Sequence, residues 1–320
     1  MLQEDDVRDV TLVKGASPSI EPETGFAAYL LRSLNDRWKK YLKELRGCRK
    51  ECTEESVHDL RVAIRRLLST LDVLRPLFPD DRLTALRKEL KDLLGEFSPL
   101  RDVQVQMLLL VQFLAAYPSL QPLYTTLVLK ERKLTKRLRK HIKKAATSRI
   151  PRYMAVARGQ LYVVLKDRAR VDGKTKALVA TAAAAFARAV QLKEMIEPAN
   201  TETIHDLRLA FKKFRYSTEM LQPIFPWMTK EHFATMNRYQ VRMGDIQDIE
   251  VFIDTVNAFV LKKRRKADES LLPMHQELAR RKTELVAAFL SSADDLHKLW
   301  TPTSEIVTIT VPHSEFPISR

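Results

Sequence analysis

Two stretches of the sequence repeat one another. Residues 56–79 read SVHDLRVAIRRLLSTLDVLRPLFP, and residues 203–226 read TIHDLRLAFKKFRYSTEMLQPIFP. A second pair follows in the same order and at nearly the same separation, FSPLRDVQVQM at 97–107 and MGDIQDIEVFI at 243–253. Self-similarity at a fixed separation is typical of a structural unit that occurs twice in one chain. We therefore expect an internal duplication with two related halves.

The halves are expected to be helical. Only 7 of the 320 residues are glycine, and tight hairpins and dinucleotide-binding loops need glycine for their positive φ angles. Proline and turn residues divide the chain into periodic segments. Ser98-Pro99 is expected to break the third segment, and Asp172-Gly173 to form a turn. Helices are expected at about 26–49, 53–75, 80–115, 122–146, 151–167, 174–196, 201–222, 229–263 and 268–291.

The domain organisation follows from these segments. Residues 1–21 are expected to form a flexible leader, residues 22–300 one helical domain, and residues 301–320 a C-terminal tail. The domain divides into a first half, 22–170, and a second half, 171–300. The acidic N-terminus lacks the apolar core of a signal peptide, and no apolar run is long enough to span a membrane. A cytoplasmic location is expected, and the sequence leaves the oligomeric state open.

The charge indicates the class of partner. Lys and Arg number 55 against 40 Asp and Glu, which gives a formal net charge of +15 and an isoelectric point near 9.8. A surface this positive attracts polyanions such as nucleic acid or polyphosphate. The alternative is a generic contribution of charge to solubility.

The repeated block places its cations on one helix face. At about 100° per residue, His58, Arg61 and Arg65 share a narrow face, and leucines and Ile64 lie opposite. Ordinary solvated faces mix both signs of charge, whereas this row is cationic over most of its length. We interpret the row and its copy as one anion-binding surface. Its residues in the second half are His205, Arg208, Lys212 and Tyr216, and Arg66 and Lys213 flank the two rows.

Two further basic segments could line the same groove. LKERKLTKRLRKHIKK at 129–144 carries cations at helical spacing, and ELARRKTEL at 277–285 is a shorter counterpart. The expected binding residues in these segments are Lys130, Lys133, Arg137, Lys140, Arg280 and Arg281. For both segments the alternative is an ordinary solvated helix.

Metal binding and catalysis are not expected. Each half offers one histidine of this kind without an HxxxH motif or a His/Cys cluster, so no metal site and no cofactor are predicted. Asp59 and Asp206 fall in a first helical turn, where a carboxylate suits the helix dipole. Asp102 and Asp248 recur once per half and are interpreted as salt-bridge partners. The two histidines remain open between ligands and structural residues.

The blocks HDLRVAIRRL, HDLRLAFKKFRY, LRDVQV and MGDIQDIEVF closely resemble the CHAD family, the conserved histidine α-helical domain, over about residues 22–300. The resemblance implies two pseudo-twofold-related four-helix bundles with a basic surface or pore between them. It also implies binding of inorganic polyphosphate and association with polyphosphate granules. The family pattern differs at Ser98, where a glycine is expected. The family's binding positions carry over to His58, Arg61, Arg65, Arg66, His205, Arg208, Lys212 and Lys213, and its second-half "RY" to Arg215 and Tyr216.

We therefore expect a non-enzymatic polyphosphate-binding protein. Three alternatives stay open: a nucleic-acid-binding helical protein, an enzyme that processes a phosphate polymer, and a scaffold that grips an acidic protein. Nucleic-acid binding by stacking needs aromatic residues among the cations, and only Tyr216 adjoins the key face. Phosphate-polymer cleavage commonly needs clustered carboxylates that hold divalent metal, and the duplicated face offers cations.

Overall fold

The computed structural model describes residues 25–77, 80–146, 149–166, 168–225, 227–262 and 271–300, without the side chains of 146, 168–173 and 262. Within these ranges the chain forms nine α-helices and no strand, which confirms the all-α expectation. The helices of the first half are α1 (Phe26–Lys50), α2 (Glu54–Leu74), α3 (Asp81–Leu114), α4 (Gln121–Ala146) and α5 (Ile150–Lys166). They are followed by α6 (Arg168–Glu194), α7 (Thr201–Met220), α8 (Lys230–Lys262) and α9 (Leu272–Leu290).

Two of the expected interruptions are wrong. Pro99 lies inside α3, which runs without a break from Asp81 to Leu114. Residues 172 and 173 lie inside α6, which begins at Arg168. A single proline removes one hydrogen bond and can be absorbed by a long helix that is packed along its length, so α3 continues.

The repeated blocks begin their helices with polar caps. Thr53 accepts a hydrogen bond from the backbone N–H of Ser56, and the Ser56 hydroxyl accepts one from the backbone N–H of Thr53. Asn200 caps α7 in a simpler way, by accepting from the N–H of Glu202. These caps satisfy amide groups that have no partner within the helix. They therefore help to set where α2 and α7 begin, and with that the rotation of both cationic faces.

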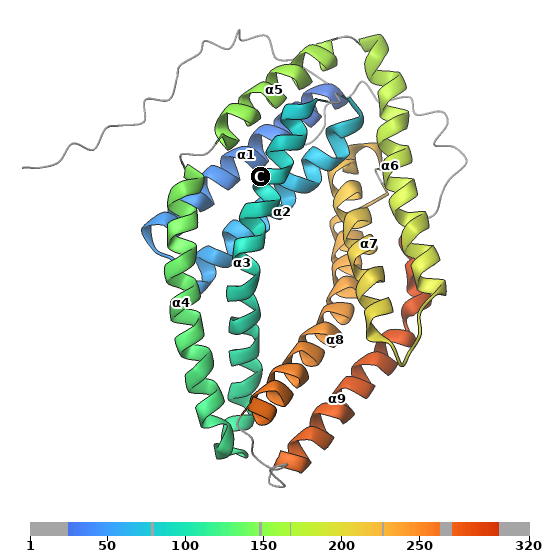
Figure 1. Ribbon diagram of the computed structural model, residues 1–320. Coiled ribbons are helices and arrows are strands. Elements are labelled where there is room, and N and C mark those ends of the chain that lie inside the picture. Colours follow the sequence, from blue (N-terminus) through green and yellow to red (C-terminus); the bar gives the residue numbers. More distant parts are fainter. Residues whose placement is uncertain are drawn as a thin grey trace, which may run out of the picture.

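Two apolar cores join the two halves. The larger core packs α1, α2, α5, α6 and α7 together with parts of α3, α4 and α8. The smaller core joins the second part of α3 and the start of α4 to α8 and α9, where the rings of Phe113 and Phe252 stack 5.9 Å apart. Figure 1 shows α3 and α4 on one side and α8 and α9 on the other, meeting again at the far end from α2 and α7. The halves thus form a closed ring of helices.

The chain after α9 adds an element that the sequence did not indicate. Residues Ala293–Leu299 form a 3₁₀ helix, and Trp300 behind it is buried. The Trp300 ring packs against Phe214 and Phe225 at centroid distances of 5.3 Å and 5.0 Å. The buried Trp300 ring therefore helps to hold the apolar face of α7, which carries Phe214, in the larger core. The predicted leader and the predicted tail lie outside the described residues.

Candidate functional site

The apolar faces of α2 and α7 lie where the sequence predicts them. Leu60, Ile64 and Leu67 on α2 are fully buried, as are Phe211 and Phe214 on α7. A fully buried large apolar side chain contributes roughly 1.5–3 kcal/mol relative to an exposed one. These faces therefore fix the rotation of both helices about their axes, and the polar faces follow from that rotation.

The polar faces of α2 and α7 meet between the two halves. Arg61 and Arg65 of α2 lie within electrostatic range of Lys212, as do Arg208 and Arg215 of α7. We call these five residues the cationic cluster. Arg61 is only 7% exposed, and the other four are half-buried. The structure therefore brings the cations of both repeats together at one place.

The electrostatics of the cationic cluster reflect uncompensated positive charge. Burial, followed by the charges of Arg65 and Arg208, lowers the pKa of Lys212 to about 7. Burial and the neighbouring Arg65 lower the pKa of Arg61 to about 10. Burial also lowers the pKa of Arg65, and Arg208 and Arg101 add to the effect. Shifts of this kind mark groups that are desolvated beside like charges, and such groups concentrate at functional sites.

Several donors of the cationic cluster have no partner. Nη1 of Arg61 and Nε of Arg208 are buried without a hydrogen bond. The Nη1 of Arg208 donates to Oε1 of Gln247 at 2.9 Å, and Gly244 on α8 leaves room for its guanidinium, since a Cβ there would lie 3.3 Å from Nη2. Buried polar groups are nearly always satisfied. The two arginines therefore each carry a buried donor for which the described residues supply no acceptor.

Three aspartates lie near the cationic cluster without pairing with it, whereas Glu219 pairs with its member Arg215 at 3.8 Å. Burial raises the pKa of Asp102 on α3 and of Asp248 on α8, although Arg61 and Arg208 respectively oppose the shift. Asp245 behaves in the same way. In the described part of the chain, none of the three makes an ion pair with the cationic cluster. The expected role of Asp102 and Asp248 as salt-bridge partners is therefore wrong, and the net charge at the site is positive.

The two histidines occupy different surroundings. His58 is exposed, with Nδ1 at 3.3 Å from the carboxylate of its neighbour Asp59. His205 is half-buried, its Nδ1 is buried without a hydrogen bond, and it lies within electrostatic range of Glu250. Glu250 in turn contacts Lys282 at 2.8 Å. The histidines therefore do not extend the cationic cluster in equivalent ways, although the sequence places them at matching positions.

The remaining residues of the repeated blocks surround the cationic cluster. Tyr216 lies within electrostatic range of Arg65, and the Arg215 guanidinium sits 4.9 Å from its ring centroid. Arg66 and Lys213 are exposed. The charge of Arg66 helps to lower the pKa of Arg37, a residue of α1 that was not among the predicted site residues. Burial lowers the pKa of Arg37, and the neighbouring Glu219 and Tyr216 oppose this shift.

The basic segment of α4 approaches the cationic cluster at one residue. The charge of Lys130 opposes the rise in the pKa of Asp102, a carboxylate that also lies within electrostatic range of Arg61. Arg137 instead pairs with Glu96 of α3 at 3.0 Å. Lys133 and Lys140 are exposed, and no contact in the described ranges joins them to the cationic cluster. A role of α4 in the same groove stays a prediction, with Lys130 in the best position for it.

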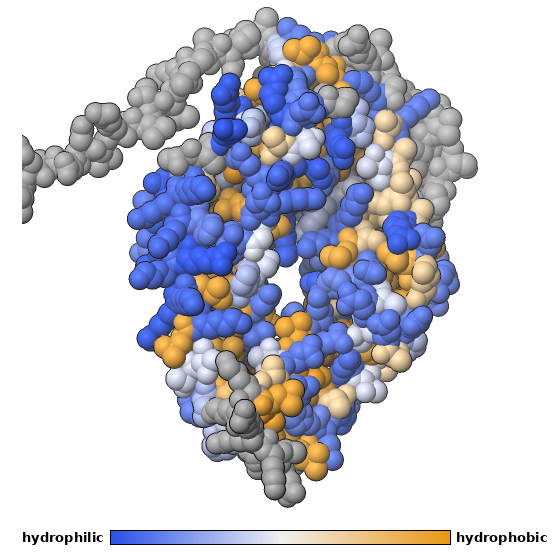
Figure 2. Space-filling model, in the orientation of Figure 1, coloured by the Kyte–Doolittle hydropathy of each residue, from blue (hydrophilic) through white to orange (hydrophobic). Residues whose placement is uncertain are grey.

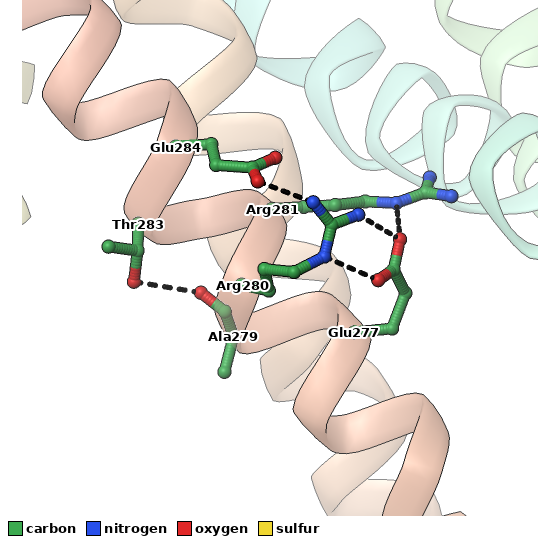
Figure 3. A network of polar contacts seen from close by, with 6 residues as sticks. All are labelled: Glu277, Ala279, Arg280, Arg281, Thr283 and Glu284. Carbon is green, nitrogen blue, oxygen red and sulfur yellow. Dashed lines mark hydrogen bonds and ion pairs between the residues drawn. The ribbon is translucent and has the colours of Figure 1, made fainter.

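The arginines of α9 are engaged by acids. Arg280 donates to both carboxylate oxygens of Glu277 at 2.8 Å and also contacts Glu284 (Figure 3). Arg281 donates to Glu277 at 2.7 Å, and its guanidinium lies 4.9 Å from the ring centroid of Phe113. Alternating charge on one helix face is the arrangement of an ordinary solvated helix. Within the described residues, Arg280 contacts Glu277 and Glu284 and not the cationic cluster.

An opening passes between α3 and α8. The space-filling view shows it as a hole through the centre of the molecule, with hydrophilic residues around much of its edge (Figure 2). A cavity of about 590 Å³ lies between α3, α8 and α9. Its polar lining comes from Arg101, Asp245, Asp248, Arg281 and Glu284. The rest of the lining is apolar and comes from Val105, Leu108, Leu109, Ile249, Leu285 and Ala288.

Arg101 was not selected from the sequence, although it stands in the repeated block LRDVQV. It lines the cavity, and its charge helps to lower the pKa of Arg61 and of Arg65. It also pairs with Glu54 at 3.1 Å. Its counterpart in the second block, Gln247, holds Arg208. The signal that could have found them is their position in the second repeated block, one residue before Asp102 and Asp248.

Two negative findings apply to the described residues. No three His, Cys, Asp or Glu side chains come together there as a group that could hold a metal ion. Over the same residues, no helix combines the length and the apolarity that a membrane crossing requires.

Comparisons with known proteins agree on the fold. The crystal structure of the CHAD domain from the plant Ricinus communis superimposes with a TM-score of 0.57 at 15% identity, covering 92% of this chain and 95% of that one. PptA from Streptomyces chartreusis gives a TM-score of 0.56 at 17% identity, covering 85% and 100%. A comparison with curated protein sequences gave no match. The sequence profile of the CHAD domain matches residues 32–257, well over half of the chain, and the protein therefore belongs to the CHAD domain family.

Proposed function

We propose that this protein binds inorganic polyphosphate at the cationic cluster and does not cleave it. The observation that carries the proposal is the group of five buried or half-buried cations from α2 and α7 with buried nitrogens that have no partner. Holding such charges together is unfavourable without an anion, and phosphate oxygens accept the paired hydrogen bonds that arginine offers. Membership of the CHAD family, which is known in polyphosphate-related proteins, supports the same ligand.

The shape of the site favours a linear polymer without sequence information. Arg101 adds a cation beside the cationic cluster, since its charge acts on Arg61 and its side chain lines the neighbouring cavity. Polyphosphate presents charge along its length and needs no aromatic platform, whereas single-stranded nucleic acid binds largely by stacking on aromatic rings. Tyr216 is the aromatic residue that adjoins the cationic cluster. Polyphosphate is thus favoured over nucleic acid.

The proposal contains no hydrolytic step. Asp102, Asp245 and Asp248 are the acids nearest the cationic cluster, and burial raises the pKa of each. Divalent-metal catalysis of phosphoryl transfer uses ionised carboxylates that hold the metal. The centre of this site is instead formed by five cations of α2 and α7. In cells that store polyphosphate, we propose that the protein associates with polyphosphate granules in the cytoplasm.

The test is a charge reversal at the junction of the two helices. The double variant Arg65→Glu/Lys212→Glu is titrated against end-labelled long-chain polyphosphate by fluorescence anisotropy. We expect the affinity to fall by more than about 100-fold, because two attractive charges become repulsive in a desolvated site. The matched control is Lys39→Glu/Lys298→Glu, which changes the net charge equally at two side chains that are each 79% exposed.

Three outcomes separate the alternatives. Equal affinities of the two double variants, with unchanged circular dichroism, would show that the cationic cluster is not the binding site. Stronger competition by single-stranded DNA than by polyphosphate at one salt concentration would favour the nucleic-acid alternative. Release of orthophosphate during incubation with magnesium or manganese would identify an enzyme. The expected result is polyphosphate binding that weakens steeply with salt, and no release of phosphate.

A further inference from the structure

Lys212 differs in kind from the other members of the cationic cluster. The four arginines remain protonated at any physiological pH, whereas a lysine amine can lose its proton when it is buried among positive charges. Lys212 is half-buried on α7 and has no hydrogen bond or ion pair among the described residues. It is therefore the member of the cationic cluster whose charge can change.

The charges that act on Lys212 come from two helices. Arg65 and Arg61 face it from α2, and Arg208 and Arg215 from α7 itself. Acids act on these arginines, since Asp102 acts on Arg61, Asp248 and Asp245 act on Arg208, and Glu219 of α7 pairs with Arg215 at 3.8 Å. Helix α6 also packs against α7, but its Arg188 donates to Gln191 at 2.7 Å and its Lys193 pairs with Asp294.

This arrangement has a defined electrostatic consequence. Removal from water and four positive neighbours lower the pKa of Lys212 from 10.5 to about 7. In slightly alkaline solution the ligand-free site therefore holds a neutral amine at its centre. Phosphate oxygens placed between α2 and α7 would offset the repulsion from the four arginines and raise the pKa of Lys212 again, because they add negative charge beside the amine.

We propose that the site takes up one proton on Lys212 each time it binds polyphosphate, so that affinity rises as the pH falls through the slightly alkaline range. This inference rests on the proposed function and adds the regulation of that site by pH. Binding and protonation are linked, so each must favour the other by the same factor. The protein would therefore hold polyphosphate more tightly where the surroundings acidify.

The pH range follows from the sign of the shift. Below about pH 7 the amine is charged with and without ligand, and no proton is taken up. In the range above about pH 7, up to the pKa that Lys212 has in the occupied site, the free site is mostly neutral and the occupied site is charged, so binding takes up a proton. Over that range the association constant is expected to fall by up to about tenfold per pH unit.

The experiment is isothermal titration calorimetry of the full chain at pH 8 with long-chain polyphosphate, whose internal phosphates stay ionised. Titrations in two buffers with different ionisation enthalpies give the number of protons taken up. Wild type is expected to take up close to one proton. Lys212→Arg keeps the positive charge but cannot discharge, so it should bind with almost no uptake. The matched control is Lys39→Arg, at a side chain that is 79% exposed on α1, which should behave like wild type.

Each outcome has a separate meaning. No binding by wild type would refute the proposed function itself. Binding without proton uptake, or equal uptake by wild type and Lys212→Arg, would refute the linkage while leaving polyphosphate binding intact. A readout without ligand is the pH dependence of Lys212 acetylation, measured by peptide mass spectrometry. A reactivity midpoint near pH 7 supports the inference, and a midpoint near pH 10 overturns it.

Discussion

Replacing Lys212 by methionine is expected to stabilise the ligand-free protein. The substitution keeps an unbranched side chain of similar length and removes a charge that sits among four arginines. Apolar replacements of a buried charge are often neutral or stabilising. If Lys212 stabilised the fold, its replacement by methionine would lower the free energy of unfolding. The experiment therefore separates a binding role of Lys212 from a structural one.

The magnitude follows from the shift of the Lys212 pKa from 10.5 to about 7. At roughly 1.4 kcal/mol per pKa unit, the charged form is disfavoured by at most about 5 kcal/mol. Lys212 is half-buried, and water screens part of the repulsion, so we expect a gain in unfolding free energy of about 1–2 kcal/mol at pH 6. For a chain of this size that gain corresponds to a rise in Tm of roughly 2–6 °C.

The gain should depend on pH. At pH 6 Lys212 is charged in the folded and the unfolded chain, and wild type carries the full repulsion. Between about 7 and 10.5 the unfolded chain binds this proton and the folded chain does not, so wild-type stability rises relative to the variant. The difference in Tm should therefore shrink from pH 6 to pH 10.

The assay is thermal denaturation followed by circular dichroism at both pH values, in buffers free of phosphate. Lys213→Met is the control for the loss of one lysine at an exposed position of the same helix. A lower Tm for Lys212→Met than for wild type at pH 6 would contradict the reasoning. So would an advantage of equal size at pH 6 and pH 10.

Two further predictions concern residues away from the centre of the site. Arg280→Ala should leave polyphosphate affinity within about twofold of wild type, because its guanidinium is already engaged by Glu277 and Glu284; a large loss in the anisotropy titration would place α9 in the site after all. Phe113→Ala should lower the unfolding free energy by about 3–5 kcal/mol, because it empties the stack with Phe252 in the smaller core. Chemical denaturation measures this loss, and an unchanged midpoint would mean that the smaller core does not hold the ring closed.

The element pattern could be predicted from the sequence because local periodicity determines it. The expected segments at 53–75 and 201–222 correspond to α2 and α7, and those at 122–146 and 151–167 to α4 and α5. The failures lie where tertiary packing outweighs local preference, at Pro99 in α3 and at residues 172 and 173 in α6. Residues Ala293–Leu299 were missed because a 3₁₀ helix has no long apolar period to detect.

The candidate site could be predicted only in part. The apolar period of α2 placed Arg61 and Arg65 on one polar face, and the period of α7 did the same for Lys212; the structure shows that the three lie near one another. The periodicity of one helix cannot report which helix lies opposite it. For this reason periodicity could not indicate that Arg37 on α1 adjoins the site, or that Arg280 on α9 is neutralised by its neighbours.

The sequence by itself determined the helices, their buried faces and the presence of matching cationic rows, because these depend on side-chain chemistry at a period of about 3.6 residues. Only the tertiary structure decided that the rows face one another, that they are largely removed from water, and that Lys212 stands without a counter-ion. The physical reason is that the pKa of a charged group depends on distance and solvent exposure. Both quantities are set by how the two halves close against each other through their shared cores.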